Sequence, residues 1–136
     1  MDKRHIELRL PTYVMLPRKT KADVKYRLNL NIYRNTQFMV LNQAKQIFAE
    51  IVKTELAGSE TIPILRPPLR LQITLWVARK CDLANVQAVV EKFYADAIVA
   101  CQIIPDDNCD IIQEGVYKFG GYDRNNPRAV VRLEEI

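Results

Sequence analysis

Three aspartates stand at the two ends of a stretch that is typical of a helix, and their carboxylates could bind a metal ion. Asp82 begins the stretch DLANVQAVVEK, and Asp106 and Asp107 follow it in PDDN. Cleaving a phosphodiester bond without a nucleophilic side chain needs a divalent ion, and hard ions such as Mg²⁺ prefer carboxylate oxygens. The same residues also fit an aspartate helix cap and an acidic turn, because a helix of about 20 residues spans about 30 Å and its ends need not meet.

A second group of residues favours contact with a polyanion. The chain has a net charge of +4 and an isoelectric point near 9.0. Much of the positive charge lies in one segment, which also contains Tyr26 and Tyr33. The cations of this segment are Arg18, Lys19, Lys21, Lys25, Arg27 and Arg34, and Lys80 is assigned to the same DNA-binding surface. Cations interleaved with aromatic rings suit a segment that touches phosphates and stacks on bases. A solvated loop whose tyrosines pack inward is the alternative.

Alternation of apolar and polar residues predicts the strands that must position these groups. The first strand starts in HIELRL and extends toward Leu16, and the second is LRLQITLWV. Two further strands, DIIQEGVYKF and PRAVVRLEE, are separated by GGYDRNN, whose glycines and asparagines predict a hairpin connection.

Apolar residues at steps of three and four predict two helices. The first is capped by Asn35 or Thr36 and ends at Gly58. The second is capped by Asp82 and cannot continue beyond Pro105.

The order of these elements predicts one domain of class α+β that covers residues 1–136. A small mixed β-sheet of about four strands, in the order strand, helix, strand, helix, strand, strand, would carry the two helices packed on it. A helix between two strands implies a right-handed crossover, so we expect the first strand to be parallel to the second and the second to the third.

Composition bounds the location of the protein. No run of about 18 apolar residues occurs, and the charged start MDKRHIELRL lacks the apolar region of a signal peptide. We therefore expect a cytoplasmic protein with no membrane partner. Cys81, Cys101 and Cys109 are odd in number and match no zinc-binding spacing, so we expect reduced thiols.

Several short motifs follow one another in a defined order over most of the chain. In the second half a strand is followed by DLANVQ, a helix containing DAI, and then PDDN. This order resembles the RusA-type Holliday junction resolvases (crossover junction endodeoxyribonucleases), whose motif is Asp-x-Asp-Asn-x-x-Lys at a helix start, a DAL-like segment and a DD pair. In the first half, LP followed by YRLNLNIYRNTQFMVLNQAK is similar to phage members of that family. Asp82 matches the first motif acid, Asn85 the asparagine, and Asp106 and Asp107 the acidic pair.

Two positions depart from the family motif. Ala84 stands where the second acid belongs, and counting forward from Asp82 places Ala88 where the lysine belongs. Before DAI, however, the chain has about four residues more than the pattern, which is close to one helical turn. Counting backward from DAI places the motif lysine at Lys92 instead, on the same side of the helix as Asp82.

The resemblance implies a structure-specific endodeoxyribonuclease that uses Mg²⁺, or Mn²⁺ in its place, to resolve Holliday junctions or other branched DNA in recombination and repair. Under this hypothesis Asp82, Asp106 and Asp107 bind the metal. Asp82 and Asp107 are catalytic together with Lys92, which stabilises developing charge, and Asn85, which orients a ligand or water. The symmetry of a four-way junction implies a homodimer, and the N-terminal likeness implies a phage or prophage origin. The alternatives are a catalytically inactive junction-binding or regulatory protein of the same fold, and a protein-interaction module without a nucleic-acid role.

Overall fold

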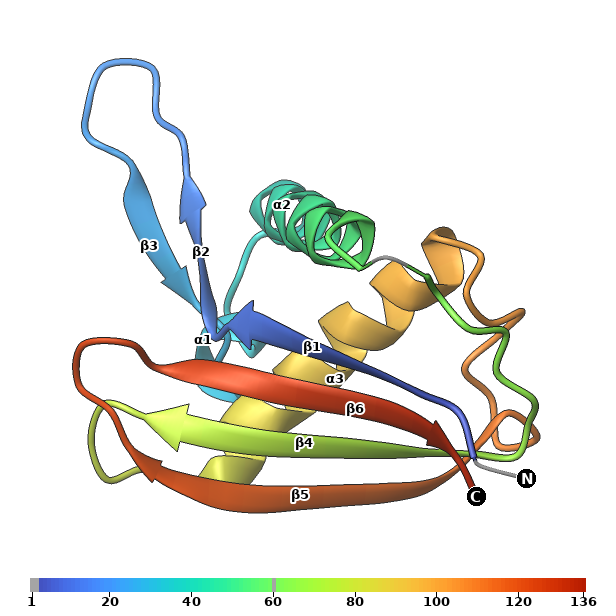
Figure 1. Ribbon diagram of the computed structural model, residues 1–136. Helices are drawn as coiled ribbons and strands as arrows, with labels where there is room; N and C mark the ends of the chain where they lie inside the picture. The colour runs from blue at the N-terminus through green and yellow to red at the C-terminus, as the bar shows by residue number, and fades with distance from the viewer. Residues whose placement is uncertain (1–2, 60) are drawn as a thin grey trace.

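The computed structural model describes residues 3–59 and 61–136 and shows an α+β protein, as the sequence predicts (Figure 1). Its elements are β1 (His5–Pro11), β2 (Tyr13–Leu16), β3 (Val24–Arg27), α1 (Leu30–Arg34), α2 (Phe38–Ala57), β4 (Leu69–Val77), α3 (Leu83–Ala100), β5 (Ile112–Tyr122) and β6 (Arg128–Glu135). No helix in either described range is long and apolar enough to cross a membrane.

The four-stranded sheet has the order β1-β6-β4-β5, which differs from the predicted pairing. β4 and β5 are parallel, as predicted, but β6 lies between β1 and β4 and is antiparallel to both. The predicted hairpin between the last two strands is therefore wrong. The first two predicted strands, β1 and β4, are parallel to each other, as predicted, but β6 separates them in the sheet. Ala129, Val131 and Leu133 of β6 are fully buried, and an apolar strand face of this kind gains most at a central position of the sheet.

Helices α2 and α3 pack against one face of the sheet. In β4, alternate residues from Leu69 to Val77 are buried, while the residues between them are half-buried on the other face. The ring of Phe48 on α2 meets that of Phe93 on α3 edge-on, with 5.7 Å between ring centroids. One apolar core therefore joins both helices to the sheet and fixes the strand ends that carry the polar groups.

A hairpin arm, formed by β2 and β3, replaces the single long strand and basic loop that the sequence predicts. The strand expected to reach Leu16 is interrupted at Thr12, after which β2 pairs antiparallel with β3. Tyr26 of β3 is buried, and its hydroxyl lies 2.8 Å from Thr36 Oγ1. The base of the arm is thus anchored in the core, while its tip projects away from the body of the molecule (Figure 1).

The short helix α1 changes the start of α2. The side chain of Asn29 caps α1 by accepting a hydrogen bond of 2.9 Å from the backbone N–H of Asn31. Asn35, a predicted cap of α2, is the C-cap of α1 instead, and Gln37 is the residue that precedes α2. Gly58 ends α2, as predicted.

Helix α3 runs from the carboxyl end of β4 toward the loop that precedes β5. Asp82 is its N-cap residue, as predicted, although the Asp82 side chain makes no capping hydrogen bond. The helix ends before the predicted limit at Pro105, because Gln102 has a φ of 62°, in the left-handed region that a right-handed helix does not use. Its 18 residues correspond to a length of about 27 Å.

Candidate nucleic-acid interface

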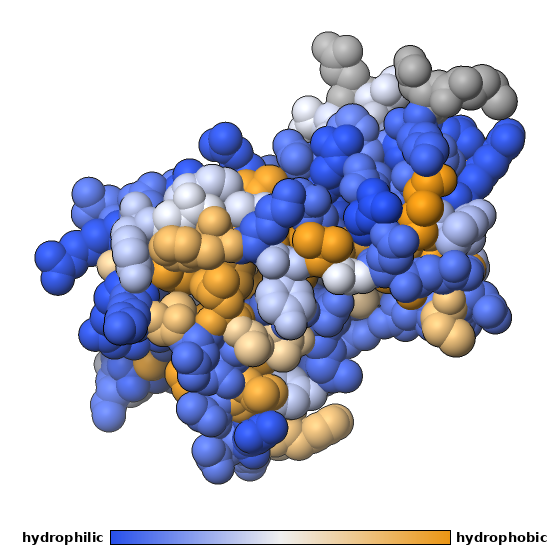
Figure 2. Space-filling model, turned by 90° about the horizontal axis from the view of Figure 1, so that it is seen from below, coloured by the Kyte–Doolittle hydropathy of each residue, from blue (hydrophilic) through white to orange (hydrophobic). Residues whose placement is uncertain are grey.

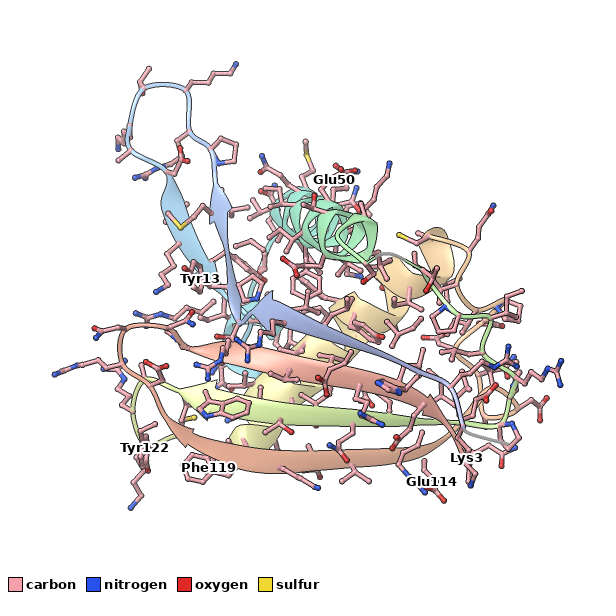
Figure 3. The ribbon with its side chains drawn as sticks, in the orientation of Figure 1. Lys3, Tyr13, Glu50, Glu114, Phe119 and Tyr122 are labelled. Atoms are coloured by element: carbon pink, nitrogen blue, oxygen red, sulfur yellow. The ribbon has the colours of Figure 1, made fainter. Side chains whose placement is uncertain are left out.

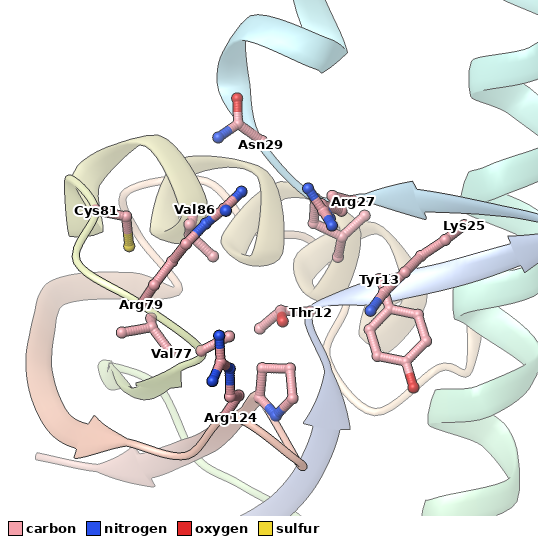
Figure 4. Close-up of a pocket in the computed structure, with 13 residues that line it drawn as sticks. Thr12, Tyr13, Lys25, Arg27, Asn29, Val77, Arg79, Cys81, Val86 and Arg124 are labelled. Carbon is pink, nitrogen blue, oxygen red and sulfur yellow. The ribbon is translucent and has the colours of Figure 1, made fainter.

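A groove lined by four cationic side chains lies at the end of the sheet where β4 terminates (Figure 4). Its volume is about 430 Å³, and its cations are Lys25 and Arg27 of β3, Arg79 after β4, and Arg124 between β5 and β6. Among the described residues, no acid lines this basic groove. Within the described ranges, none of the four cations forms an ion pair. The groove is therefore an uncompensated positive surface, which favours an anionic ligand.

Strand β3 positions two of the cations by its alternation. Because Tyr26 points into the core, its neighbours Lys25 and Arg27 point outward on one face. The Lys25 ammonium lies 4.2 Å from the centroid of the Tyr13 ring on the paired strand, a cation–π contact that orients the lysine.

The connection between β5 and β6 positions Arg124. The backbone N–H of Asp123 donates a 2.9 Å hydrogen bond to the carbonyl of Val77, which ties this connection to the end of β4. The Asp123 carboxylate pairs with Arg128 at 2.8 Å and accepts from the backbone N–H of Asn126 at 3.2 Å. The nearest acid in the chain is thus occupied elsewhere, and the side chain of Arg124 reaches the groove.

The start of α3 forms part of the groove wall. Cys81 and Val86, on either side of the first helical turn, both line it. The unpaired N–H groups of a helix start carry partial positive charge and attract phosphate. Asp82 lies beside this wall but does not line the groove.

The tip of the arm carries three further cations beyond the groove. Arg18, Lys19 and Lys21 are all exposed there, and Arg18 Nε donates a 2.8 Å hydrogen bond to the carbonyl of Ala22. Together with Lys25, these side chains extend the basic groove into a track along the arm.

The other residues assigned to DNA contact lie outside this track. Tyr33 packs edge-on against Phe93, with 6.5 Å between ring centroids, and Tyr26 is buried, so the predicted stacking on bases is wrong for the buried Tyr26 and finds no support at the half-buried Tyr33. Arg34 is exposed on α1, and Lys80 is exposed beside Arg79, but neither lines the groove.

The acids of the expected metal site lie at different ends of the sheet. Asp82 follows the carboxyl end of β4, whereas Asp107 precedes β5, whose start pairs with the start of β4. The nine residues of β4 span about 30 Å between these two ends of the sheet. Asn85 lies in the first turn of α3, where its N–H donates to the carbonyl of Asp82 at 3.1 Å. Asp82 and Asn85 therefore belong to the groove end of the molecule, and Asp107 does not.

Asp106 organises its own loop. Its two carboxylate oxygens accept hydrogen bonds from the backbone N–H of Asp107 at 2.7 Å and from the side-chain amide of Asn108 at 3.1 Å. This pattern is the side-chain chemistry of a turn. The alternative that PDDN is an acidic turn accounts for Asp106 fully.

Lys92 and Asp107 line a second cavity, of about 410 Å³, on the flank of α3. Ala88 lines it too, so the forward and backward counts of the motif lysine both lead to this place. Glu91 and Glu114 complete its acidic lining, but each already has a partner. Gln87 donates to Glu91 at 3.0 Å, and Arg70 pairs with Glu114.

The structure does not bring the predicted ligands Asp82, Asp106 and Asp107 together. In the two described ranges, no group of three or more histidine, cysteine, aspartate or glutamate side chains is arranged to hold a metal ion. The described residues thus offer no three-ligand site for Mg²⁺, and binding of the ion by one or two of these carboxylates stays a prediction.

Comparison with known proteins adds no family. No protein-family model and no curated protein matches the chain. The fold and the groove therefore define only a class of protein. It is a small α+β protein with a basic groove at the strand ends and a basic arm beside the groove.

Sequence reasoning missed two residues of the groove, Arg79 and Arg124. Arg79 had a signal, because it directly follows a predicted strand and precedes a predicted helix, where ligands of α/β sheets often bind. Arg124 had none, because a hairpin between β5 and β6 would have left it at an isolated turn. The crossing of this connection over the end of β4 brings it to the groove.

Proposed function

We propose that this protein binds branched DNA and that the basic groove holds the phosphate backbone. The observation that carries the proposal is the convergence of Lys25, Arg27, Arg79 and Arg124 on a groove that no acid in the described part of the chain lines. Each cation that neutralises a phosphate releases a counterion, which makes such a surface favourable for nucleic acid.

The length of the basic surface favours a polymer over a single small anion. Three exposed cations, Arg18, Lys19 and Lys21, continue from the groove to the arm tip. A free phosphate or nucleotide would use only one part of this track, whereas a duplex carries one charge per about 1.7 Å of its axis and can engage all of it.

The shape of the surface favours a branch over a straight duplex. The arm projects from the body of the molecule (Figure 1), while the groove lies at the end of the sheet, so the two sets of cations belong to different parts of the molecule. Two duplex arms that diverge from a junction would meet both sets at once. The resemblance to junction resolvases agrees with this preference.

A binding assay tests the proposal. We expect fluorescence anisotropy to show tighter binding of a synthetic four-way junction than of a duplex or a single strand of matched sequence. Absence of affinity for all three DNAs at low salt would refute DNA binding. Equal affinity for junction and duplex would refute the preference for branches while leaving DNA binding in place.

A second candidate function, metal-dependent cleavage of the bound junction, is favoured by one observation. Lys92 and Asp107, two of the residues that the resemblance makes catalytic, line the same cavity. The Lys92 ammonium is placed to offset charge on a phosphate oxygen beside Asp107.

Nicking of a labelled junction with Mg²⁺ and with Mn²⁺ separates the two candidates. The cleavage hypothesis requires nicks that disappear in Asp107→Asn and Lys92→Ala and persist in Asp106→Asn, because Asp106 serves the loop. A junction that is bound and never nicked under either metal contradicts cleavage and leaves the binding function alone.

A further inference from the structure

The outer edge of β5 is a surface that the basic groove and the arm do not use. β5 is the last strand of the sheet, paired with β4 on one side and with no strand of the described chain on the other. None of its 11 residues is buried, although alternate residues of its neighbour β4 are. An exposed edge of this length is a template for another strand.

Three large aromatic side chains make this edge apolar. Tyr117, Phe119 and Tyr122 are 53%, 51% and 62% exposed, and the rings of Phe119 and Tyr122 meet edge-on at 5.2 Å. Phe119 and Tyr122 lie along the outer margin of β5 (Figure 3). In the view from below, onto this margin, apolar side chains reach the surface among hydrophilic ones (Figure 2). Exposed aromatic rings of this kind are typical of protein interfaces.

The charges of β5 are self-complementary. Its only charged residues are Glu114 and Lys118, which have opposite sign and lie four positions apart on the same face, with Val116 midway between them. In an antiparallel pair of identical strands, residues at equal distances from the midpoint face each other across the strands. A second copy of β5 therefore offers the charge pattern that this edge matches.

We propose that β5 pairs antiparallel with β5 of a second copy of this chain, about a two-fold axis at Val116. Glu114 of each copy, which also pairs with Arg70 of its own chain, then faces Lys118 of the other copy, and Tyr117 faces Gly115. A side chain at Gly115 would meet only Glu91 Oε1, at 3.7 Å, so the glycine leaves room for the ring. A register shift of about four residues either way, which moves the two-fold axis to Glu114 or Lys118, sets that residue against its own copy, which is unfavourable.

The pairing joins two sheets into one continuous sheet and leaves the basic groove free, although Gln113, Glu114 and Gly115 of β5 also line the Lys92 cavity. The partner is a second copy of this chain, because an unrelated strand would not present the same two opposite charges at matching positions. The pairing also places one basic groove at each of two opposite ends of the dimer, since the paired β5 strands run in opposite directions.

The first test measures association of the full chain by sedimentation at concentrations of about 10 to 100 μM, where edge contacts of modest size are populated. We expect a dimer that Lys118→Glu weakens about tenfold, because two ion pairs become two repulsions. The control Lys53→Glu changes the same charge at an exposed site on α2 and should leave the dimer intact. A wild-type monomer throughout this range overturns the proposal.

The second test reads the register by cross-linking, in a background with the three native cysteines replaced by serine. Directly opposed Cα atoms in antiparallel strands are about 4.5 to 5.5 Å apart, within disulfide range. We expect Val116→Cys to form a disulfide with its copy under mild oxidation. Gln113→Cys, on the same strand, would lie about six residues from its copy, or about 20 Å, and should stay reduced. A dimer in which Val116→Cys does not cross-link uses another surface, and the proposal is then wrong.

Discussion

The cations of the basic groove should set the salt dependence of DNA binding, and removing three of them tests this directly. In the variant Arg27→Gln, Arg79→Gln, Arg124→Gln, the groove keeps its shape and only Lys25 of its charge. All three arginines lack ion-pair partners in the described parts of the chain, so their loss leaves no carboxylate unpaired. The fold should be unaffected, which thermal unfolding of the variant will show.

The expected change follows from counterion release. Each phosphate contact contributes about −0.9 to the slope of log affinity against log salt, so three lost contacts make the slope about 2.7 less steep. The four groove cations alone correspond to a slope of about −3.6, or a loss of roughly 150-fold in affinity between about 50 mM and about 200 mM salt. With one cation left, the same change in salt costs about 3.5-fold. Contacts from the arm tip add equally to both slopes and leave their difference unchanged.

Anisotropy titrations of a labelled junction at several salt concentrations provide the measurement. The matched control replaces Lys3, Lys53 and Arg66 with glutamine. These cations are equal in number and exposed, and Lys3 and Arg66 lie at the opposite end of the sheet from the groove. If the control flattens the slope as much as the groove variant does, net charge governs binding and the groove has no special role. An unchanged slope in the groove variant would refute the proposed contact surface.

Two predictions concern the sheet that supports these surfaces. Gly120→Ala should lower the free energy of unfolding by about 1 to 3 kcal/mol, because a Cβ at Gly120 would lie 2.6 Å from the Trp76 ring and force the packing to shift. Gly58→Ala, which meets nothing closer than 3.5 Å, is the control, and Trp76 fluorescence during urea unfolding reports both. On the open face of the sheet, a hydrogen bond from Arg132, and to a smaller extent one from Arg70, holds the pKa of Glu134 below its ordinary value. Its stabilising effect is thus present above the ordinary carboxyl range and lost as pH falls, so Glu134→Gln should lower the urea midpoint near pH 7 and not near pH 3. An equal loss at both pH values would contradict this account.

The elements that sequence periodicity could predict are those whose environment is local. α2, α3 and β4 were located correctly because their apolar residues repeat at the period of a helix or a strand. The strand order was not accessible in this way, since it depends on which strand gains most from a central position, and β6 takes it through Ala129, Val131 and Leu133. Tyr26 shows the same limit, because whether a tyrosine stacks on a base or fills a core is decided by packing.

The residues of the candidate site also divide into those that a local sequence pattern predicts and those that only the strand order brings together. Lys25 and Arg27 were identified from their density in one segment, and the strand alternation that turns them outward is a local property. Arg124 reaches them only because a connection crosses the end of β4, which no local pattern contains. The ligands Asp82 and Asp107 failed to meet for the converse reason. The sequence motif gives the order of these two aspartates but not the distance between them in space. Helix α3 lies between Asp82 and Asp107 in the chain and holds them apart.

The fold therefore assigns its charges to different ends of one sheet. The carboxyl end of β4 faces the first turn of α3, and there the cations gather, as they do where helix starts and strand ends in α/β sheets bind phosphates. The opposite end holds the PDDN turn, whose Asp107 lines a cavity together with Lys92 from the middle of α3. A phosphate in the basic groove thus lies beside Asp82 and away from Asp107. If cleavage occurs at the Lys92 cavity, the DNA must run along the flank of α3 from the basic groove to that cavity, past Ala84 and Ala88. The small side chains at these two positions leave that path open, and Ala84 removes an acid from the flank that DNA would have to follow.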